Sequence, residues 1–178
     1  MELTVNVGEG QVGVRTDFDP FFHAHFERVA RAAALVARDP SAGQDLAQEA
    51  FARLLERWDR MTSDDHARNF AYKVAINLAR SHVRKHGRVF LYGLRDRDTA
   101  GSTGGIDAAD AWFEMSEALG ALSPRQRACV ILVDYADMDS ARAADILGMS
   151  AATVRVHLTR GRRALQHRLR TARKEDPA

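Results

Sequence analysis

Arginine recurs on one side of the segment 151–165, at a spacing that could bind nucleic acid. If the segment is an α-helix, the apolar residues Val154, Leu158 and Leu165 share one face and would pack inward. A guanidinium can pair with a guanine edge or a phosphate, and an α-helix fits the major groove of DNA. The residues predicted to contact duplex DNA, at the start of this helix and on its polar face, are Ser150, Thr153, Arg155, Val156, Thr159, Arg160 and Arg163.

A helix, a tight turn and a second helix are predicted to position these side chains. The stretch RAADILGMSAATVRVHLTR (142–160) ends one apolar helix at Gly148 and begins the next at Ser150, a favoured N-cap residue. This pattern is typical of a helix-turn-helix. Eight Lys or Arg and no acid lie between Arg155 and Lys174, although the whole chain has a net charge of only +2. A solvated basic helix would show the same charge run, but the turn, the cap and the amphipathic face together favour DNA binding.

A second basic face lies in the first half of the chain, on a helix predicted from about 67 to 84. Its polar residues recur at offsets of zero, four, seven and eleven, which places three cations and one amide in a narrow stripe. An amide among cations suits contact with bases beside phosphates, although the stripe alone also fits an ordinary solvated helix face. Phe70, Tyr72 and His66 lie near the preceding loop, where aromatic rings could stack on unpaired bases. The stripe consists of Lys73, Asn77, Arg80 and Arg84, extended by Lys85 and Arg88.

The chain is predicted to be all-α, with two small helical bundles joined by a flexible linker. Apolar residues recur at three- and four-residue spacing from Phe18 onward, and no stretch has a convincing strand pattern. The stretch DTAGSTGGID has the composition of a linker. The predicted segments are a flexible tail over 1–16, an N-terminal bundle over 17–88, a linker over 89–112, a helix-turn-helix bundle over 113–171 and a tail over 172–178.

Local signals predict where several helices begin and which residues fill the core. Pro40 and Ser41 are expected to end the first helix, with Ser41 as the N-cap of a second helix over 42–58. Ser123, followed by Pro124 and a polar residue one turn on, predicts the start of a later helix. The apolar stripe predicted for the first helix consists of Phe18, Phe22, Phe26, Val29, Ala33 and Val36.

Three blocks of the chain together resemble one known family. They are DLAQEAFARLLERW (45–58), NFAYKVAINLARSHVRK (69–85) and LSPRQRACVILVDYADMDSARAADILGMSAATVRVHLTRGRRAL (122–165). In this order and spacing they look like the bacterial extracytoplasmic-function (ECF) sigma factors, the two-domain, minimal members of the sigma-70 family. The resemblance extends from Phe18 to Arg170. It implies that the N-terminal bundle is region 2 of the family, that the C-terminal bundle is region 4, and that the protein is not an enzyme.

The resemblance implies that core RNA polymerase is the main protein partner. The helix over 45–58 would dock on the clamp helices of the largest subunit, and region 4 would contact the flap of the second-largest subunit. Many members are held inactive by an anti-sigma factor that covers the same surfaces, so such a factor is a further candidate partner. No cofactor, metal or membrane is implied, and the expected location is the cytoplasm. The predicted docking face consists of Asp45, Gln48, Glu49 and Arg53.

The resemblance also implies that promoter DNA is bound at two places. Region 4 would read the −35 element as a duplex with its arginine-bearing helix, chiefly at Arg155, Val156, Thr159 and Arg160. Region 2 would bind the −10 element as a separated strand, with a flipped base held by the loop 61–68, and so promote DNA melting. The residues expected to bind the separated strand are His66, Lys73, Asn77, Arg80, Arg84 and Lys85.

Two stretches depart from the family pattern. Phe70, Ala71 and Tyr72 stand where a Trp before a Leu-Tyr pair is common, so base stacking would be weaker. Val156 and His157 stand where polar or basic residues are frequent. The preferred promoter sequence therefore does not transfer from a relative.

Two other classes of protein fit parts of the sequence. A helix-turn-helix regulator that is not a polymerase subunit would account for the C-terminal half alone, and binding to core polymerase would separate the two classes. An enzyme is disfavoured, because the sequence has no glycine-rich phosphate loop, and because His23 and His25 fall on different helix faces and make a poor metal pair. Asp45 and Glu49 share a face, but Arg53 continues it, so an exposed ion-pair ladder is the simpler account.

Composition argues against several further classes. The single cysteine excludes a disulfide framework and a Cys-rich zinc site, and Cys129, within the apolar run ACVILV, is predicted to be buried. No stretch approaches the roughly 18 apolar residues of a membrane-spanning helix. The N-terminal residues lack the basic start and apolar core of a signal peptide. We therefore expect an intracellular protein.

Overall fold

Helices make up nearly all of the structure. The computed structural model describes residues 17–86 and 106–175, and no strand occurs among them. This confirms the predicted all-α class. In order along the chain, the elements are α1 (Phe18–Ala37), α2 (Pro40–Leu55), the short 3₁₀ helix η1 (Trp58–Arg60), α3 (Asp64–His86), α5 (Ile106–Gly120), α6 (Pro124–Val130), the π-helical turn η2 (Ile131–Tyr135), α7 (Ser140–Leu147) and α8 (Ala151–Glu175).

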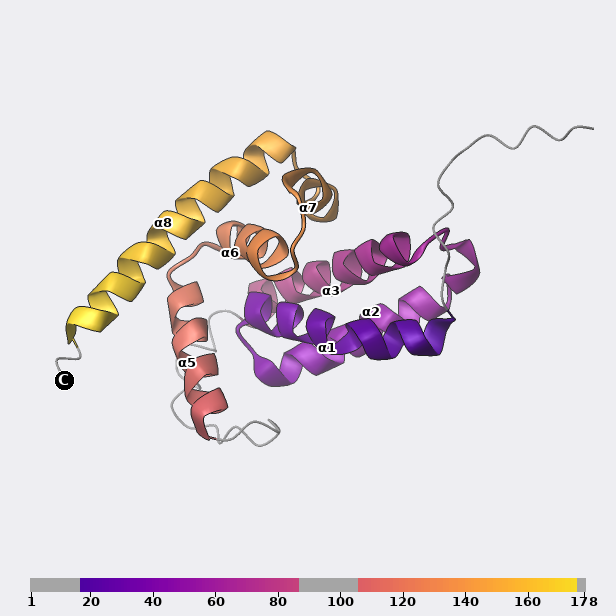
Figure 1. The fold of residues 1–178 in the computed structure, drawn as a ribbon, viewed down its shortest axis with the longest axis horizontal. Coiled ribbons are helices and arrows are strands. Elements are labelled where there is room, and N and C mark those ends of the chain that lie inside the picture. The colour runs from indigo at the N-terminus through magenta and orange to yellow at the C-terminus, as the bar shows by residue number, and fades with distance from the viewer. Residues whose placement is uncertain (1–16, 87–105, 176–178) are drawn as a thin grey trace, which may run out of the picture.

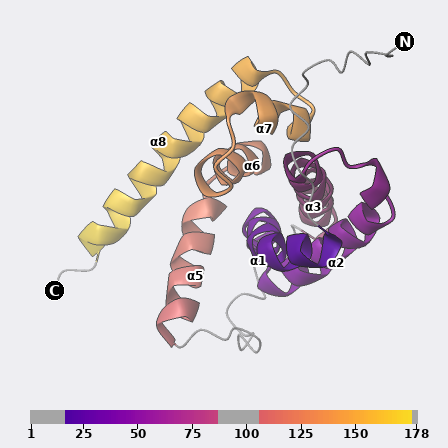
Figure 2. The ribbon, with the colours of Figure 1, turned by 45° about the vertical axis from the view of Figure 1, so that its right-hand side comes forward.

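The helices form two groups that lie in contact. The first group consists of α1, α2 and α3, which pack side by side, and the second consists of α5, α6, η2, α7 and α8. Within the second group, α6, η2 and α7 lie between the first group and the long helix α8 (Figure 1). The turned view shows the same order, with α8 extending past the helices on which it packs (Figure 2). Buried apolar residues from both groups, such as Val36 and Leu119, belong to one continuous core. The two groups therefore share a core in this structure.

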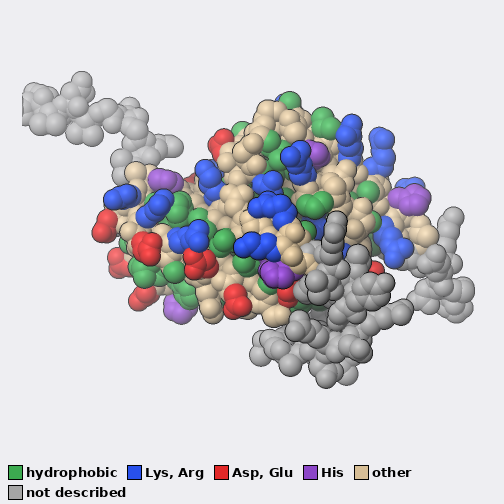
Figure 3. Space-filling model, turned by 180° about the vertical axis from the view of Figure 1, so that it is seen from behind, with side chains coloured by type: hydrophobic (Ala, Val, Ile, Leu, Met, Phe, Trp, Pro, Cys, Tyr) green, Lys and Arg blue, Asp and Glu red, His purple; other side chains and the backbone are tan. Residues whose placement is uncertain are grey.

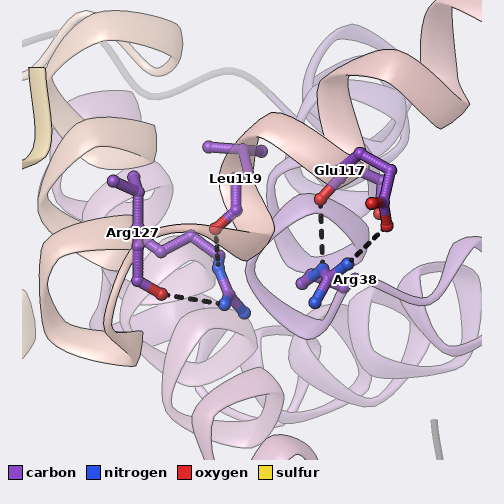
Figure 4. Close-up of polar contacts among 6 residues, drawn as sticks. Arg38, Glu117, Leu119 and Arg127 are labelled. Carbon is purple, nitrogen blue, oxygen red and sulfur yellow. Dashed lines mark hydrogen bonds and ion pairs between the residues drawn. The ribbon is translucent and has the colours of Figure 1, made fainter. Parts of the chain in front are cut away.

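Arg127 joins the two groups at the C-terminal end of α1 (Figure 4). Its side chain is buried and donates to the carbonyl oxygens of Val36 at 3.0 Å, Leu119 at 3.0 Å and Leu122 at 3.1 Å. The last turn of α1 has no basic residue of its own, so a guanidinium 91 residues further along the chain supplies positive charge where the helix dipole is negative. Burial lowers the pKa of Arg127 to about 10, which still leaves the group charged at neutral pH.

Arg38 makes a second connection, from the residue that follows α1. Its backbone has φ of 59°, a left-handed conformation that ends the helix. Its side chain donates to the carbonyl oxygen of Ser116 at 3.1 Å and to the carboxylate of Glu117 at 3.1 Å, both on α5 (Figure 4). Together, Arg38 and Arg127 hold α5 and the turn that follows it against the end of α1.

The predicted helix starts are confirmed at Ser123 and corrected at Ser41. Ser123 accepts a hydrogen bond from the backbone N–H of Gln126, whose side chain accepts one from the N–H of Ser123, so the two form a capping box. The N-cap of α2 is Asp39 and not Ser41: its carboxylate accepts from the N–H groups of Ser41 and Ala42, both at 3.1 Å. An anionic cap also complements the positive end of the helix dipole, which a hydroxyl does not.

The aromatic packing of the first group differs from the predicted stripe. Phe21, which the stripe omitted, is buried, whereas Phe18, Phe22 and Phe26 are only partly buried. Trp58 belongs to η1 and not to α2, which ends three residues earlier than predicted. The Trp58 ring packs on Phe18 and Phe21, with ring centroids 5.2 Å and 5.1 Å apart.

Helix α5 begins inside the segment that was predicted as a linker. Its first residue is Ile106, and the sequence IDAADAW supplies an early Asp and several Ala, both favourable at the start of a helix. The remainder of the predicted linker, the tail over 1–16 and residues 176–178 lie outside the described residues.

Gly43 allows α1 and α2 to approach closely. A Cβ atom at this position would lie 2.4 Å from the Cβ of Ala34 and 2.8 Å from the carbonyl oxygen of Ala30, both on α1. Such distances require the two helix backbones to move apart. Because the close contact is with backbone and a short side chain, neither neighbour can turn away.

We expect Gly43→Ala to lower the free energy of unfolding by about 1–2 kcal/mol. Overpacking of a core costs about 1–3 kcal/mol, which outweighs the gain of up to about 1 kcal/mol from replacing Gly by Ala in a helix. Chemical denaturation followed by circular dichroism would measure the change, with the exposed neighbour Gln44→Ala as the control. A stabilising effect of Gly43→Ala would show that α1 and α2 are not packed this closely.

Candidate nucleic-acid interface

The turn between α7 and α8 is built from capping residues at both helix ends. α7 starts at the N-cap Asp139, whose carboxylate accepts from the N–H of Arg142 at 2.8 Å. It ends at Gly148, which has φ of 64°. The hydroxyl of Ser150 accepts from the N–H of Thr153 at 3.1 Å, as expected of an N-cap, and lies 2.8 Å from the Thr153 hydroxyl. These caps fix the direction in which α8 leaves the turn.

The two faces of α8 are those that periodicity predicted. Val154 and Leu158 are buried, Leu165 is partly buried, and Gly161 lies so close to Val130 on α6 that a Cβ there would be 2.9 Å from a Val130 methyl. This contact orients the opposite face of α8 outward. That outward face forms a shallow depression lined by Ala152, Arg155, Val156, Thr159, Arg160 and Arg163.

Five of the seven residues predicted to bind duplex DNA thus line one surface. The other two, Ser150 and Thr153, are exposed at the first turn of α8, where they bond to each other. Ala152 was missed by the sequence reasoning, although its place one turn before Val156 is a signal that could have found it. The arrangement offers three guanidinium groups around small side chains, which suits contact with phosphates and base edges in a groove.

The stripe on α3 is exposed along most of its length. Lys73, Asn77, Arg84 and Lys85 are exposed, whereas Arg80 is half-buried. Burial lowers the pKa of Arg80, and the neighbouring positive charges of Arg84 and Arg125 lower it further. The stripe residues also bond within the helix: Arg80 donates to the side-chain oxygen of Asn77 at 3.4 Å. The α3 stripe therefore presents cations and an amide to solvent on one helix face.

Two expectations around the start of α3 are wrong. The helix begins at Asp64, three residues earlier than predicted, so His66 lies in its first turn and not in a loop. The ring Nδ1 of His66 lies 3.2 Å from the Thr62 hydroxyl. Tyr72, predicted to lie near the loop and stack on bases, has only 2% of its surface exposed, and burial raises its pKa to about 12. Tyr72 therefore belongs to the core, and Phe70, which is half-buried beside the Arg57 guanidinium, is the more accessible ring.

The polar face of α2 is open to solvent. Its four predicted docking residues are all exposed, and α2 lies on the side of its bundle away from α8 (Figure 2). The Glu49 carboxylate and the Arg53 guanidinium form an ion pair at 2.7 Å, with both side chains about half exposed. Such an exposed pair contributes little stability, so a partner could break it at small cost. The four residues are Asp45, Gln48, Glu49 and Arg53.

Charge is distributed unevenly over the molecule. In the view from behind, Lys and Arg side chains run across the middle of the face and along the end formed by α8, while most Asp and Glu side chains gather toward the opposite end, among further Lys and Arg (Figure 3). The low net charge of the chain therefore conceals a strongly basic region. This basic region is the expected electrostatic footprint of a nucleic-acid partner.

Within residues 17–86 and 106–175, no group of three or more His, Cys, Asp or Glu is placed to hold a metal ion. Cys129 is fully buried, as predicted, and burial raises the pKa of its thiol to about 11. None of the described helices is both long and apolar enough to cross a membrane.

Comparison with known proteins matches both halves of the chain to one family. Residues 21–89 match the family described as Sigma-70 region 2, and residues 112–165 match Sigma-70, region 4. An RNA polymerase sigma-E factor of Streptomyces avermitilis is 31% identical over 155 residues, covering 86% of this chain and 85% of the relative. The sigma-E factor of Streptomyces antibioticus is 34% identical over 135 residues, covering 75% and 73%.

Two solved structures have a similar fold. The sigma factor RpoE of Bartonella quintana, in complex with the anti-sigma factor NepR, superposes with a TM-score of 0.69 at 22% identity, covering 86% of this chain and 97% of that one. CnrH, in complex with the cytosolic domain of CnrY, superposes with a TM-score of 0.66 at 21% identity, covering 86% and 88%.

Proposed function

The chain belongs to the sigma-70 family, as an ECF sigma factor with regions 2 and 4, and on this premise we propose how its surfaces are used. It binds core RNA polymerase through α2, reads the −35 promoter element as a duplex with α8, and holds the −10 element as a separated strand on α3. Sigma factors are transcription initiation factors and not enzymes, so the chemistry of RNA synthesis would belong to the polymerase.

One observation carries this proposal: a single chain presents two exposed basic faces, on α3 and α8, and a separate polar face on α2. Duplex binding by α8 would fix the register on the promoter. Capture of unpaired bases by α3 would offset the cost of unpairing, a few kcal/mol for a flipped base. Because both faces belong to one chain, binding at one raises the local concentration of the other.

Reading both elements at once requires the two groups of helices to separate. A compact chain of 178 residues has a radius of gyration of roughly 16 Å. The −35 and −10 elements are about 25 base pairs apart, which is roughly 85 Å along B-DNA at about 3.4 Å per base pair. Separation would break the bond of Arg127 to Val36 but keep its bonds to Leu119 and Leu122, which belong to its own group. Core polymerase would hold the two groups apart, and the free chain would bind promoters poorly.

We also propose that the protein acts in the cytoplasm, where RNA polymerase acts, and that an anti-sigma factor controls it. Support for such a partner comes from the complex in which RpoE of Bartonella quintana was solved, with the anti-sigma factor NepR. An anti-sigma factor that covers the α2 face would compete directly with polymerase. Region 4 would contact the flap of the second-largest polymerase subunit.

Co-elution with core RNA polymerase is the first test. The purified chain is mixed with core polymerase from a Streptomyces species, the genus of two curated relatives, and run on size exclusion without DNA. We expect a stoichiometric complex. No complex, together with tight binding to duplex DNA alone, would place the protein among helix-turn-helix regulators and remove the role proposed for α2.

Arg155→Ala and Arg160→Ala should each weaken recognition of the −35 element by about 1–3 kcal/mol, because each removes a guanidinium that can contact a base edge. Transcription from the cognate promoter by the reconstituted holoenzyme would measure the loss. Arg170→Ala, an exposed arginine further along α8 and outside the depression, is the matched control. Full activity of both variants would show that this face does not read the promoter.

A further inference from the structure

Val156 is an exposed apolar residue on the arginine-bearing face of α8. It is 47% exposed, whereas Val154, two residues earlier on the same helix, is fully buried. It lines the same depression as Arg155, Arg160 and Arg163, so a branched apolar side chain sits among three guanidinium groups. A valine has no hydrogen-bond donor or acceptor, so its side chain cannot read a base by hydrogen bonding.

Two further side chains that line the depression, Ala152 and Thr159, donate no hydrogen bond to a base. Ala152 carries only a methyl group. The hydroxyl of Thr159 donates to the backbone carbonyl of Arg155 at 2.9 Å, so its proton is already used within the helix. The depression therefore combines the apolar side chains of Ala152 and Val156 with three arginines.

Major-groove chemistry identifies what the exposed side chain of Val156 would contact. Of the groups that base pairs present in the major groove, the C5-methyl of thymine is the apolar one. Resting on the function proposed above, we propose that Val156 is a specificity-determining residue that selects a thymine in the −35 element by contact with its methyl group. Arg155, Arg160 and Arg163 would supply the flanking contacts to phosphates or guanines.

A protein partner is the less favoured occupant of this surface. Single exposed apolar residues are common and need no partner. A protein that covered Val156 would also have to desolvate the three surrounding arginines, which is costly unless each is paired. DNA supplies both the methyl group and the anionic flanks that this surface fits.

Removing the thymine methyl tests the proposal directly. The reconstituted holoenzyme first selects an upstream element from a library of promoters randomised there. Each thymine of the selected element is then replaced singly by deoxyuridine, which differs only by the missing methyl. We expect binding to weaken roughly fourfold at one thymine, the value for one buried methyl group. In Val156→Ala the same replacement should have almost no effect.

Two controls keep the result specific. Leu169→Ala removes another exposed apolar side chain of α8, outside the depression, and should keep the full response to deoxyuridine. Val156→Thr, which retains one methyl group and a similar shape, should keep part of it. Circular dichroism would verify that each variant is folded, as expected for exposed positions.

The outcomes separate this inference from the function on which it rests. If a sequence is selected but no deoxyuridine weakens binding, or if Val156→Ala responds like the parent, Val156 does not read thymine and the proposed function stands. If the holoenzyme assembles but selects no upstream sequence, the role proposed for α8 fails as well. If Val156→Ala loses core polymerase and not DNA, Val156 contacts a protein, and the inference is overturned.

Discussion

Replacing Arg127 by Met should lower the free energy of unfolding by about 3–5 kcal/mol. The substitution removes three charge-assisted hydrogen bonds. The carbonyl oxygens of Val36 and Leu122 lose this partner, whereas that of Leu119 still accepts from the N–H of Leu122, and each unsatisfied buried group costs about 1–3 kcal/mol. All three bonds are buried, and Leu119 and Leu122 are themselves buried at the end of α5 and in the turn after it. Urea denaturation followed by circular dichroism would measure the change.

Arg125→Met is the matched control for this experiment. Arg125 lies two residues earlier on α6 and is exposed, so its replacement should change the free energy of unfolding by less than about 0.5 kcal/mol. Arg127→Lys should fall between the two, because an ammonium keeps the charge but cannot reach three divergent acceptors with a planar group. Equal stability of the two Met variants would mean that the guanidinium does not hold the end of α1.

Replacing Glu49 by Arg should abolish the complex with core RNA polymerase while leaving the fold intact. The residue lies in the middle of the exposed α2 face, and reversing its charge sets a cation against a surface that is proposed to accept a carboxylate. Like-charge contacts across an interface cost several kcal/mol, enough to prevent co-elution at micromolar concentration. The lost pair with Arg53 is half exposed and contributes little to folding.

Glu27→Arg makes the same change in charge at an exposed position on α1, outside the docking face, and should co-elute like the parent. This control separates a local effect from a change in net charge. Co-elution of Glu49→Arg in stoichiometric amounts would exclude the middle of α2 from the polymerase surface. Loss of binding in both variants would point to long-range electrostatics instead.

Periodicity predicted the parts of the fold that depend on near neighbours in the sequence. The inward face of α8 and the caps at Ser123 and Ser150 follow from residues within one or two turns of one another. For the same reason the five residues around the α8 depression could be grouped from their spacing alone. Their roles in binding DNA remain predictions, because the fold brings them together without a ligand.

The features that the sequence did not predict are of two kinds. Some are set by residues far away in the sequence, and others are choices between two residues or two orientations that fit the local pattern equally well. The role of Arg127 is set by a carbonyl 91 residues away, and that of Gly43 by Ala34 on the neighbouring helix. Tyr72 has a polar tip and an apolar ring, so helix periodicity alone could not decide whether it faces solvent or the core. Asp39 and Ser41 are both good N-cap residues, so the sequence alone does not decide between them. Asp39 caps α2 because its carboxylate accepts hydrogen bonds from two N–H groups.

The acceptors of Arg127 are all main-chain oxygens, and this has a consequence for how such chains can diverge. A substitution at position 36, 119 or 122 that leaves the backbone in place keeps the carbonyl oxygen that accepts the hydrogen bond. These contacts therefore constrain the type of residue only at position 127. Correlated substitutions between the two halves would therefore not reveal the contact. A chimera could join the N-terminal half of this chain to the C-terminal half of a relative. It should keep the hydrogen bond to the carbonyl oxygen of Val36 wherever the relative has arginine at the position of Arg127. Recombination between such genes could exchange promoter-reading halves without a matched change on the other side.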